Sequence, residues 1–326
     1  MIRAAIYGLG RWGGRLLESV RESDKIRITT GISRDPSRHA ELAQRAGIRI
    51  VKSYAGVLKN PDIDAVVLAT PHSQHCTQVV QAAAAGKHVF VEKPFTLTRK
   101  TAERAIDACR QGNVTLALGF NRRFSPAFIE MVRRIEAGEI GDVLHVEGQN
   151  SGPTGHSLKA GNWRATRKEA PGGGMTARGI HALDCMIRIA GPVTRVYARS
   201  QKRALAPEID MDDTTAMLLD FARGASGCLT AVFATGDYWR VAAMGTKGWL
   251  ESRSDTELVF RGLTGAPQRS PFEAVDKERA ELEAFADAIA AGRRFLVPPE
   301  AMVNGIAVLE SIEKSSAKGR PIAIEP

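Results

Sequence analysis

The segment IRAAIYGLGRWGG, residues 2–14, decides the fold of the first part of this chain. Its opening run, IRAAIY, is apolar enough for a buried β-strand, and Gly8, Gly10 and Gly13 follow at the spacing G-x-G-x-x-G. In this context the first glycine permits a tight turn, the second lets the backbone approach a phosphate, and the third lets a helix pack closely on the strand. The segment therefore predicts a strand, a turn that binds a dinucleotide pyrophosphate, and the start of a helix.

The same alternation of apolar runs and helix-like segments continues to about residue 122. We expect strands within residues 25–32, 63–71, 87–94 and 114–120, and helices within 13–22, after Pro36, and within 78–86 and 101–112. Strands that alternate with helices at this spacing form βαβ units, whose parallel sheet is covered by helices on both faces. Residues 1–122 are therefore predicted to form a doubly wound α/β domain.

From Asp142 onward the pattern changes to extended segments joined by short turns. These segments lie at residues 143–151, 194–203, 214–222, 226–234, 239–245 and 248–254, and helices are expected within 172–191, 278–292 and 301–319. Consecutive strands favour a mainly antiparallel sheet. Residues 123–326 are therefore predicted to form a second, α+β domain, and a chain of 326 residues usually does divide into two domains.

The composition excludes several classes of protein. With 44% hydrophobic and 25% charged residues the chain is typical of a globular protein, and no run approaches the roughly 18 apolar residues of a membrane span. The N-terminus MIRAAIYGLG lacks the basic and long apolar regions of a signal peptide. We therefore expect a cytoplasmic protein that has no membrane partner.

Cysteine spacing and net charge narrow the possible partners further. Cys76, Cys109, Cys185 and Cys228 are scattered and form no C-x-x-C pair, which argues against a disulfide framework and against a metal site. The formal charge of +9 would suit nucleic acid, a phosphate-bearing cofactor or an acidic substrate. Because the basic residues are spread along the chain and no nucleic-acid-binding motif is present, we do not expect a nucleic-acid partner.

The residues after the second predicted strand bear on the choice of cofactor. An acidic side chain at this place would accept hydrogen bonds from the ribose hydroxyls of NAD. The sequence instead has Ser33 and Arg34, with Arg38 four residues further on, and a hydroxyl with guanidinium groups suits the 2′-phosphate of NADP. Asp35 would serve NAD if the strand ended two residues later, and the arginines could be plain surface charges. We expect NADP, with NAD as the alternative.

Two further segments follow predicted strands at the carboxyl edge of the sheet, where ligands of doubly wound folds bind. ATPHSQH, residues 69–75, is expected to line the cofactor cleft, since apart from Cys76 nothing completes a metal-ligand set with its histidines. VFVEKP, residues 89–94, ends in a lysine that can hydrogen-bond a substrate oxygen and offer positive charge where negative charge develops. The predicted cofactor contacts are Gly8, Leu9, Gly10, Arg11, Trp12, Gly13, Ser33, Arg34, Arg38, Thr70, Pro71, His72, His75, Glu92 and Lys93.

The segment GGGMTARGIHALD, residues 172–184, places three glycines before a predicted helix that carries His181 and Asp184. Residues three apart share a helix face, so the carboxylate of Asp184 can reach the imidazole. A histidine held in this way is a candidate general acid or base. The alternative is that His181 is a buried histidine of the core.

Taken together, these segments resemble the Gfo/Idh/MocA family of NAD(P)-dependent oxidoreductases. The resemblance runs in order through G-x-G-x-x-G, ATPHSQH, GKHVFVEKP, GFNRRFSP, the glycines before His181, GTKGWLE and SIEKSSAKGRPIAI, and its most specific piece is EKP. It implies a Rossmann domain followed by an α/β domain with an open, mainly antiparallel sheet. It also implies oxidation or reduction of sugars, cyclitols and related compounds by a homodimer or homotetramer joined through that sheet.

The resemblance assigns the catalytic positions to Lys93 and His181, which would face the nicotinamide. An aspartate usually stands four residues before this histidine, where it would orient the imidazole and raise its pKa, but this chain has Ala177 there. Three explanations stay open. Asp184 holds the imidazole instead, or the reaction is a carbonyl or imine reduction with the acid supplied otherwise, or catalysis is lost and the protein senses NADP.

The residues predicted on the substrate side are Asn121, Arg122, Trp163, Arg164 and His181. The basic loop is the segment GNWRATRKEA, residues 161–170. If the predicted residues converge with the other cations in and near this loop, an acidic substrate such as a sugar acid becomes attractive, because arginine binds carboxylates through two hydrogen bonds. The glycine-rich segment behind this loop could order over bound substrate. The predicted function is hydride transfer between NADP and a sugar, cyclitol, sugar acid or related carbonyl or imine compound, and the alternative is a catalytically silent NADP sensor.

Overall fold

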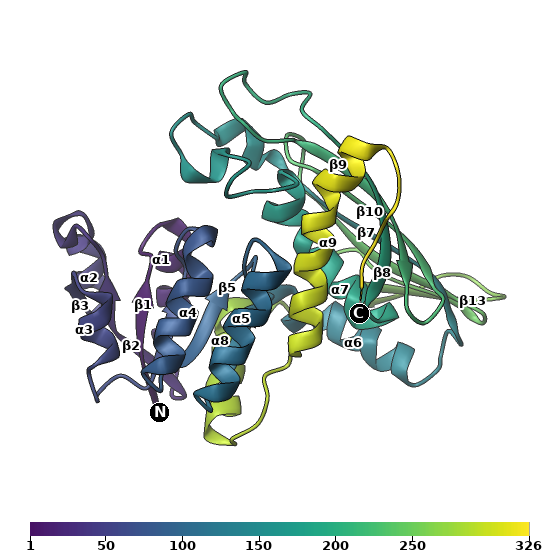
Figure 1. The fold of residues 1–326 in the computed structure, drawn as a ribbon. Coiled ribbons are helices and arrows are strands. Elements are labelled where there is room, and N and C mark those ends of the chain that lie inside the picture. The colour runs from purple at the N-terminus through teal and green to yellow at the C-terminus, as the bar shows by residue number, and fades with distance from the viewer. Residues whose placement is uncertain (326) are drawn as a thin grey trace. The chain divides into compact units, whose positions relative to one another are not determined.

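The computed structural model describes residues 1–325, which form two compact units. The first unit comprises Met1–Thr96, Lys100–Asn121 and Asp276–Met302. The second unit comprises Leu97–Arg99, Arg122–Val275 and the chain from Val303 onward. Figure 1 follows the chain through both units by colour, and each unit is described below by itself.

The predicted boundary after residue 122 marks a real change of unit, but a single boundary is wrong. Helix α8 (Lys277–Ala290) returns to the first unit, where it packs against strand β5 (His88–Glu92). The ring of Phe285 on α8 lies 5.9 Å from that of Phe90 on β5. The physical reason is that the apolar face of an amphipathic helix can cover any exposed sheet face, near or far in sequence.

The first unit is built on a parallel sheet of six strands in the order β3-β2-β1-β4-β5-β6. Besides β5, its strands are β1 (Ile2–Tyr7), β2 (Ile26–Ile32), β3 (Arg49–Val51), β4 (Ala65–Leu68) and β6 (Leu116–Gly119). The helices between them are α1 (Arg11–Ser19), α2 (Ala40–Ala46), α3 (Tyr54–Leu58), α4 (His75–Ala84) and α5 (Arg99–Gln111). This order confirms the predicted doubly wound fold: strands β1 to β3 are added toward one edge of the sheet, and strands β4 to β6 are added toward the other.

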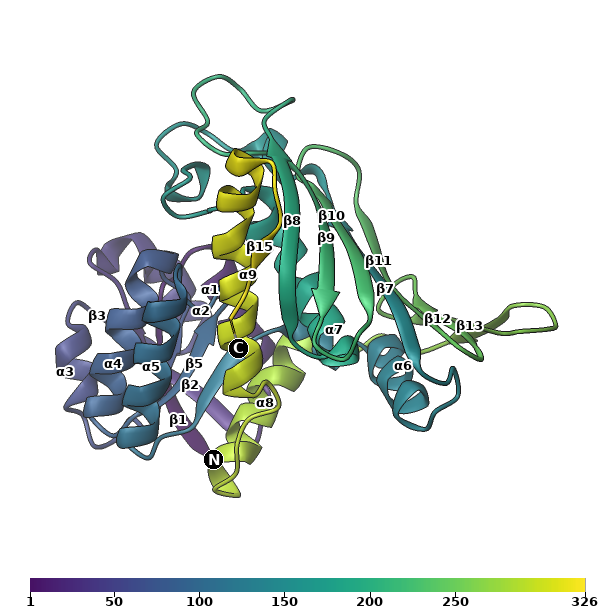
Figure 2. The same cartoon turned by 45° about the vertical axis from the view of Figure 1, so that its right-hand side comes forward.

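Burial explains why these short apolar runs are strands. All four residues of β4 are buried, as are Val89–Glu92 of β5, because helices cover the sheet on both faces. Figure 2 shows α3, α4 and α5 in a row over one face, and α8 packs against α1, β2 and β5. The carboxyl ends of β1, β4 and β5 consequently meet at one edge of the sheet.

The second unit is built on a nine-stranded sheet in the order β14-β13-β12-β11-β7-β10-β9-β8-β15. The strands are β7 (Val143–Ser151), β8 (Val193–Gln201), β9 (Thr214–Phe221), β10 (Ser226–Val232), β11 (Tyr238–Gly245), β12 (Gly248–Ser252), β13 (Glu257–Gly262), β14 (Gln268–Pro271) and β15 (Ile322–Ala323). All the pairings are antiparallel except that of β7 with β10. The predicted open, mainly antiparallel sheet is therefore confirmed.

Helices cover one face of this sheet and leave the other face open (Figures 1 and 2). The helices are α6 (Pro126–Glu136), α7 (Ile180–Ala190) and α9 (Pro299–Lys318). Along β9 buried residues alternate with exposed or half-buried ones, as expected for a sheet that is covered on one side. Asn304 fixes α9 on β8 through two hydrogen bonds of 2.8 Å with the backbone of Val193.

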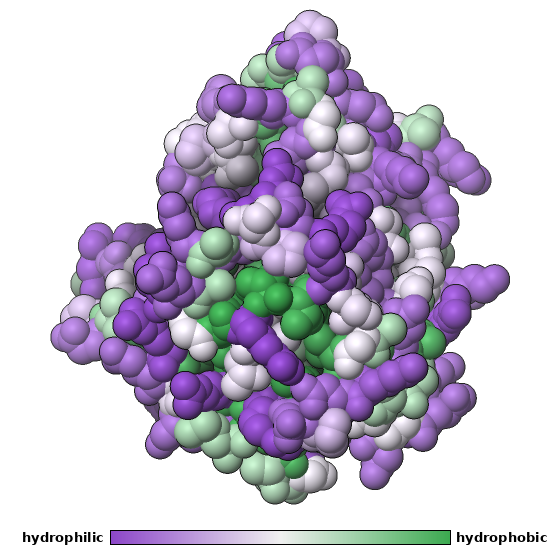
Figure 3. All heavy atoms as spheres, turned by 90° about the vertical axis from the view of Figure 1, so that its left-hand side faces the viewer, coloured by the Kyte–Doolittle hydropathy of each residue, from purple (hydrophilic) through white to green (hydrophobic). Residues whose placement is uncertain are grey.

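In the face drawn in Figure 3, hydrophilic residues predominate and hydrophobic residues gather in one patch near the middle. Within residues 1–325, none of the helices combines the length and the apolar character that crossing a membrane requires.

Candidate active site

The turn after β1 has the geometry expected of a pyrophosphate-binding turn. Gly8 has a φ of +103°, which L side chains rarely adopt, and a Cβ on it would lie 2.3 Å from the carbonyl oxygen of Ala69. A Cβ on Gly13 would lie 1.8 Å from the carbonyl oxygen of Gly8, so a glycine is needed for α1 to start this close to β1. Gly10 differs, because no described atom lies within 4 Å of a Cβ placed there. Its backbone therefore leaves room for a phosphate at the N-terminus of α1.

The other predicted residues of this turn divide between core and surface. Leu9 is buried, and its Cδ1 lies 2.9 Å from the position of a Cβ on Gly31. Arg11 is exposed at the first position of α1, while Trp12 is half-buried with its indole beside Glu92. Leu9 therefore contributes only backbone to a ligand at this turn.

At the ribose end, β2 stops at Ile32, so Ser33 is the first residue after the strand. The Ser33 hydroxyl donates to the carbonyl oxygen of Asp35 at 3.0 Å and accepts from its N–H at 3.2 Å. The Asp35 carboxylate accepts from the Ser37 hydroxyl, and this hydrogen bond holds its pKa below the usual value. Arg34 and Arg38 are exposed on this loop and the short helix that follows, Pro36–His39. Two exposed guanidinium groups and a hydroxyl thus lie where the sequence predicts the 2′-phosphate site.

The segment 69–75 is less open than the sequence suggests. His75 is fully buried, and its two ring nitrogens lie 3.0 Å from the carbonyl oxygen of Pro94 and 3.1 Å from that of Thr70. Thr70 is buried as well, and its hydroxyl donates to Gln78 at 2.6 Å. The expectation that the His75 side chain contacts cofactor is therefore wrong: it ties the end of β4 to the end of β5. Pro71 and His72 are half-buried beside it.

The end of β5 presents a lysine beside a buried carboxyl group. Lys93 is half-buried, and its backbone N–H donates to Glu92 Oε2 at 3.2 Å. The Glu92 side chain is only 5% exposed, and burial raises its pKa to about 7, although the charge of Lys93 opposes this. Glu92 is therefore part of the buried support of this sheet edge, and the less buried Lys93 follows it at the end of the strand.

Asn121, predicted on the substrate side, is turned into the first unit. It is 7% exposed, and its amide Nδ2 donates to Glu278 Oε1 at 2.7 Å. Glu278 also accepts from Arg15 at 2.8 Å. The assignment of Asn121 to substrate is therefore not supported, because its amide connects the end of β6 with α8.

Arg122 also has partners within its own unit. Its guanidinium forms an ion pair with Asp255 at 2.5 Å and lies 4.4 Å from the centre of the Trp239 ring. Both partners belong to the second unit, as Arg122 does. The positive charge expected to meet an acidic substrate is thus already balanced by a carboxylate.

The segment before His181 is a π-helical turn, Met175–Gly179, which leads directly into α7. Such turns are wider than α-helical turns and are frequent at functional sites. The predicted helix over 172–191 is thus correct in place but differs in its first turn. His181 lies on the second residue of α7 and is half-buried.

Asp184 has a different role from the one expected. Arg123 donates to its two carboxylate oxygens at 2.7 Å each, and both side chains are 3% exposed. The expectation that Asp184 orients the imidazole of His181 is therefore wrong, because the carboxylate faces the buried guanidinium instead. Sequence spacing along the helix could not reveal a partner 61 residues away.

The arginines of the basic loop and Arg178 of the π-helical turn do not converge on one point. Arg167 pairs with Asp212 at 3.1 Å, and Arg178 pairs with Asp237 at 2.7 Å. Arg164 is exposed and stacks over its neighbour Trp163, with 4.0 Å between the guanidinium carbon and the ring centre. This pattern gives no cluster of cations that would select an acidic substrate.

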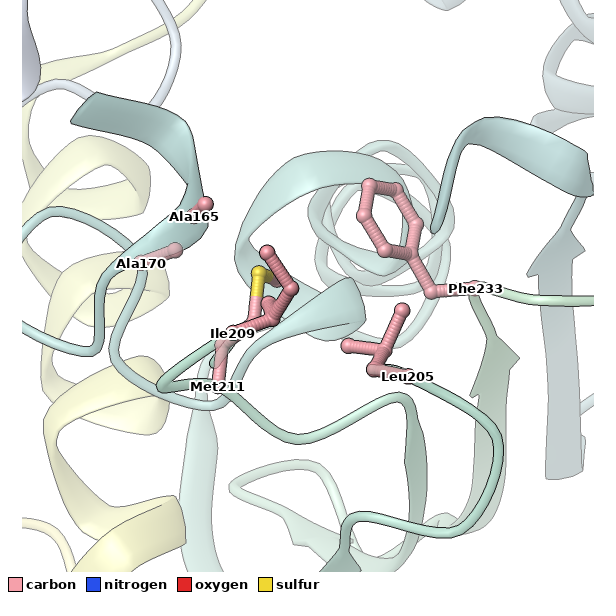
Figure 4. Close-up of a cluster of buried hydrophobic side chains, with 6 residues drawn as sticks. All are labelled: Ala165, Ala170, Leu205, Ile209, Met211 and Phe233. Atoms are coloured by element: carbon pink, nitrogen blue, oxygen red, sulfur yellow. The ribbon is translucent and has the colours of Figure 1, made fainter. Parts of the chain in front are cut away.

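A small apolar cluster, drawn in Figure 4, holds the basic loop against the rest of the second unit. Phe233 lies above Leu205, and Ile209 lies beside Met211, next to the loop that carries Ala165 and Ala170. Ala177 packs against the same cluster, although it is only partly buried. Ala177 therefore borders apolar surroundings, next to which a carboxylate would lose part of its contact with water.

Sequence reasoning missed the carboxyl groups of α8. Glu281 is fully buried in the first unit, and burial together with Glu92 raises its pKa well above the usual value. The available signal was the spacing of Glu278, Glu281 and Phe285, which places all three on one helical face. Among the described residues there is no group of three or more histidine, cysteine, aspartate or glutamate side chains arranged to hold a metal ion.

Family models match both units of the chain. The model described as "Oxidoreductase family, NAD-binding Rossmann fold" matches residues 2–120. The model described as "GFO/IDH/MocA C-terminal domain" matches residues 128–251. These two matches follow one another in the order that the family requires.

Individual relatives agree with this assignment. The chain is 28% identical to the uncharacterized oxidoreductase YrbE of Bacillus subtilis, over 99% of this chain and 97% of that protein. It is also 28% identical to D-xylose 1-dehydrogenase (NADP(+)) 2 of Haloferax volcanii, over 90% of each chain. A match of 29% identity to an uncharacterized oxidoreductase of Streptococcus pneumoniae covers 59% of this chain, which spans about half, 51%, of that protein.

Solved structures agree as well. A putative NADPH-dependent oxidoreductase of Desulfitobacterium hafniense DCB-2 superposes with a TM-score of 0.91 at 27% identity, over 99% of this chain and 97% of that one. The aldose-aldose oxidoreductase of Caulobacter crescentus, complexed with glycerol, superposes with a TM-score of 0.89 at 25% identity, over 99% of both chains. Together with the glycine turn and the six-stranded parallel sheet, these matches show that the chain belongs to the Gfo/Idh/MocA family of NAD(P)-dependent oxidoreductases.

Proposed function

We propose that this protein is an NADP-preferring dehydrogenase or reductase that acts on an uncharged polyhydroxy compound, such as a sugar or a cyclitol. The observation that carries the proposal is that Lys93 and the glycine turn lie at the same edge of the parallel sheet, at the ends of β5 and β1. Lys93 is half-buried there, which strengthens the interaction of its charge with a substrate oxygen.

NADP is favoured by the residues that follow β2. Because the strand ends at Ile32, Ser33 occupies the place of the acidic residue that would bind the NAD ribose. Asp35, the alternative NAD ligand, directs its carboxylate to Ser37. The exposed guanidinium groups of Arg34 and Arg38 supply the donors that a 2′-phosphate needs.

An uncharged substrate is favoured by the pairing of the arginines. Arg122, Arg167 and Arg178 each have a carboxylate partner within the second unit. Binding an acidic substrate through them would mean breaking those ion pairs. The names of the xylose-oxidising and aldose-oxidising relatives also point to sugars rather than sugar acids.

The proposed reaction needs a hydride carrier and two side chains of the protein. The nicotinamide, when bound, accepts or donates the hydride. Lys93 hydrogen-bonds the reacting oxygen and stabilises the negative charge that develops on it, and His181 gives up or receives a proton as general acid or base. The proposal gives Asp184 no part in the proton transfer.

We further propose a homodimer or homotetramer that buries the open face of the second sheet. Tyr197 and Leu218 are register partners on β8 and β9, and they are 39% and 55% exposed. Cys228 on β10 pairs with Leu218 and extends this apolar row across a third strand. A Leu218→Lys substitution, which leaves the covered face untouched, is expected to lower the mass measured by light scattering.

The decisive experiment combines binding and turnover on one preparation. NADPH and NADH affinities are measured by fluorescence titration, and oxidation or reduction is then tested with sugars, cyclitols, sugar acids and carbonyl or imine compounds. Lys93→Ala and His181→Ala are expected to retain NADPH binding and to abolish turnover. Tight NADPH binding without turnover on any compound would favour the silent sensor. Failure to bind either cofactor would refute the proposal.

A further inference from the structure

Two buried carboxyl groups face each other in the first unit, on α8 and at the end of β5. Phe285 on α8 packs against Phe90 on β5. Glu281 precedes Phe285 by one helical turn, and Glu92 follows Phe90 by two residues on the same face of the strand. The packing that joins the two rings thus also brings Glu281 to Glu92.

Neither carboxyl group has the donors that an ionised pair would need. Glu281 is 0% exposed, and within residues 1–325 both of its oxygens lack a hydrogen-bond donor. Glu92 Oε2 accepts from the Lys93 N–H, but Oε1 lacks a donor within the same residues. Gly119 contributes to this confinement, because a Cβ on it would lie 2.8 Å from Glu92 Oε1.

Arg15 on α1 is engaged by other carboxylates of the first unit. Arg15 donates to Glu278 at 2.8 Å and pairs with Asp276 at 3.2 Å. Lys93 favours ionisation of Glu92 and Lys277 favours that of Glu281, but burial is the largest effect on each carboxyl group. Two carboxylates buried side by side cannot both stay ionised inside a protein, because desolvation and mutual repulsion both favour the neutral form. A shared proton removes both costs, since a carboxylic acid can donate to a carboxylate.

We propose that Glu281 is held as a carboxylic acid whose O–H is donated to Glu92 Oε1, and that it thereby acts as a positioning residue for Lys93. The pair then carries at most one negative charge, fixed next to the lysine backbone. The protonation of Glu281 is independent of any activity. Its consequence for catalysis rests on the proposed role of Lys93.

The electrostatic surroundings agree with this arrangement. Glu281 faces Glu92, Glu278 and Asp276, which disfavour its ionisation, and Lys277, which favours it; burial is the largest effect and raises its pKa. Glu92 faces Lys93 and Trp12, which favour its ionised form, and Glu278, which disfavours it. The proton therefore belongs on Glu281, and the negative charge belongs on Glu92, closer to Lys93.

The donated O–H determines the charge on Lys93. It stabilises the Glu92 carboxylate, which in turn stabilises the ammonium form of the lysine. Without that donor, the pKa of Glu92 rises further above its ordinary value, and at neutral pH the ammonium group loses the negative charge of Glu92. Removing the donor is thus expected to raise the pKa of Glu92 and to lower that of Lys93.

The protonation is tested by carbon-13 NMR on the full-length protein labelled at the glutamate carboxyl carbons, with and without NADPH. One signal is expected to remain in the carboxylic acid form through neutral pH and to be missing in Glu281→Gln. If every glutamate signal of the folded protein ionises near its ordinary pKa, the proposal is refuted. This test needs no substrate, so its failure is distinguishable from failure of the proposed function.

The positioning role is tested by titrating the lysines after reductive methylation with carbon-13, with Lys93 identified by its loss in Lys93→Arg. Glu281→Gln keeps a donor and is expected to leave the midpoint of Lys93 nearly unchanged, whereas Glu281→Met is expected to lower it. Glu283→Met, on the same helix but paired with Ser23 and Arg279, is the matched control. Equal midpoints in the glutamine and methionine variants would overturn the positioning role. Should the methionine variant not fold, Glu281→Leu takes its place, and the carboxyl titration still decides the protonation.

Discussion

The guanidinium of Arg123 donates two hydrogen bonds of 2.7 Å to the carboxylate of Asp184, and both side chains are almost completely buried. Arg123 precedes α6, and Asp184 lies on α7, so this ion pair joins two helices of the second unit. It fixes the helix that carries His181 without contributing to proton transfer.

Removal of one partner of this ion pair should lower the stability of the folded protein. Arg123→Met leaves a buried carboxylate without its cation, and we expect a loss of about 3–5 kcal/mol in the free energy of unfolding. Urea denaturation followed by tryptophan fluorescence reports mainly on the second unit, which holds Trp163, Trp239 and Trp249. The double variant Arg123→Met with Asp184→Leu should recover most of the loss. A single variant as stable as the unmodified protein would contradict the buried ion pair.

Two glycines of the first turn should respond differently to alanine. Gly13→Ala places a Cβ on the carbonyl oxygen of Gly8 and should destabilise the first unit, because α1 must move away from β1. Gly10→Ala meets no described atom within 4 Å, so it should leave stability unchanged and weaken NADPH binding by about tenfold or more. Thermal unfolding and fluorescence titration separate the two effects. Equal losses of stability in both variants would disprove this distinction.

Cofactor preference should depend on the loop after β2. Arg34→Ala removes a charged donor from the 2′-phosphate and should weaken NADPH binding by roughly 10- to 100-fold, with little change for NADH. Ser33→Asp should improve NADH binding and oppose NADPH. Glu41→Ala, on the following helix, is a control that should change neither affinity. A parallel loss of both cofactors in Arg34→Ala would exclude a specific contact with the phosphate.

The apolar surroundings of Ala177 predict that the family's usual aspartate cannot simply be restored. Ala177→Asp would place a carboxylate against the cluster of Figure 4, and we expect a loss of about 1–3 kcal/mol in stability. We also expect no gain in turnover. Ala177→Ser tests the effect of polarity without charge. A faster and equally stable aspartate variant would instead show that the site accepts a carboxylate.

Glu92 should make stability depend on pH. Below pH 4.5 the group is protonated in both the folded and the unfolded chain, so it has no effect on the pH dependence. Between pH 4.5 and about 7 the unfolded chain loses the proton while the folded chain retains it, so stability falls as pH rises, by on the order of 3 kcal/mol. Unfolding free energies of the unmodified protein and Glu92→Gln should therefore diverge over this range. Parallel curves would rule out the raised pKa.

The doubly wound sheet could be predicted because strands that are buried on both faces appear in the sequence as short apolar runs. The glycine turn could be predicted because backbone clashes at Gly8 and Gly13 leave no other residue type. The return of α8 to the first unit could not be predicted, since the apolar face of a helix does not specify which sheet it covers. Strands β13 and β14 were missed for a related reason, because their mixed polar sequence follows no clear alternation.

Within the site, positions along the backbone were more predictable than side-chain partners. The place of Lys93 at the carboxyl edge of the sheet was predicted because the parallel topology fixes it, whereas its catalytic role came from the family resemblance. The partners of Asp184, Asn121 and His75 were not predicted, because each forms its contacts with residues that become neighbours only in the folded chain. The arginines of the basic loop were misjudged as available cations for the same reason.

The π-helical turn Met175–Gly179 stands directly before α7, the helix that carries His181. A π-turn contains about one residue more than an α-turn, and one residue of an α-helix corresponds to a rotation of roughly 100°. Because the π-turn goes round once with one residue more, deleting one residue from it would let it relax into an α-helix while the imidazole keeps nearly the same direction. A one-residue deletion inside α7, by contrast, would rotate every later side chain of that helix by about 100°, so the wide turn is the place where this segment can change length without re-aiming His181.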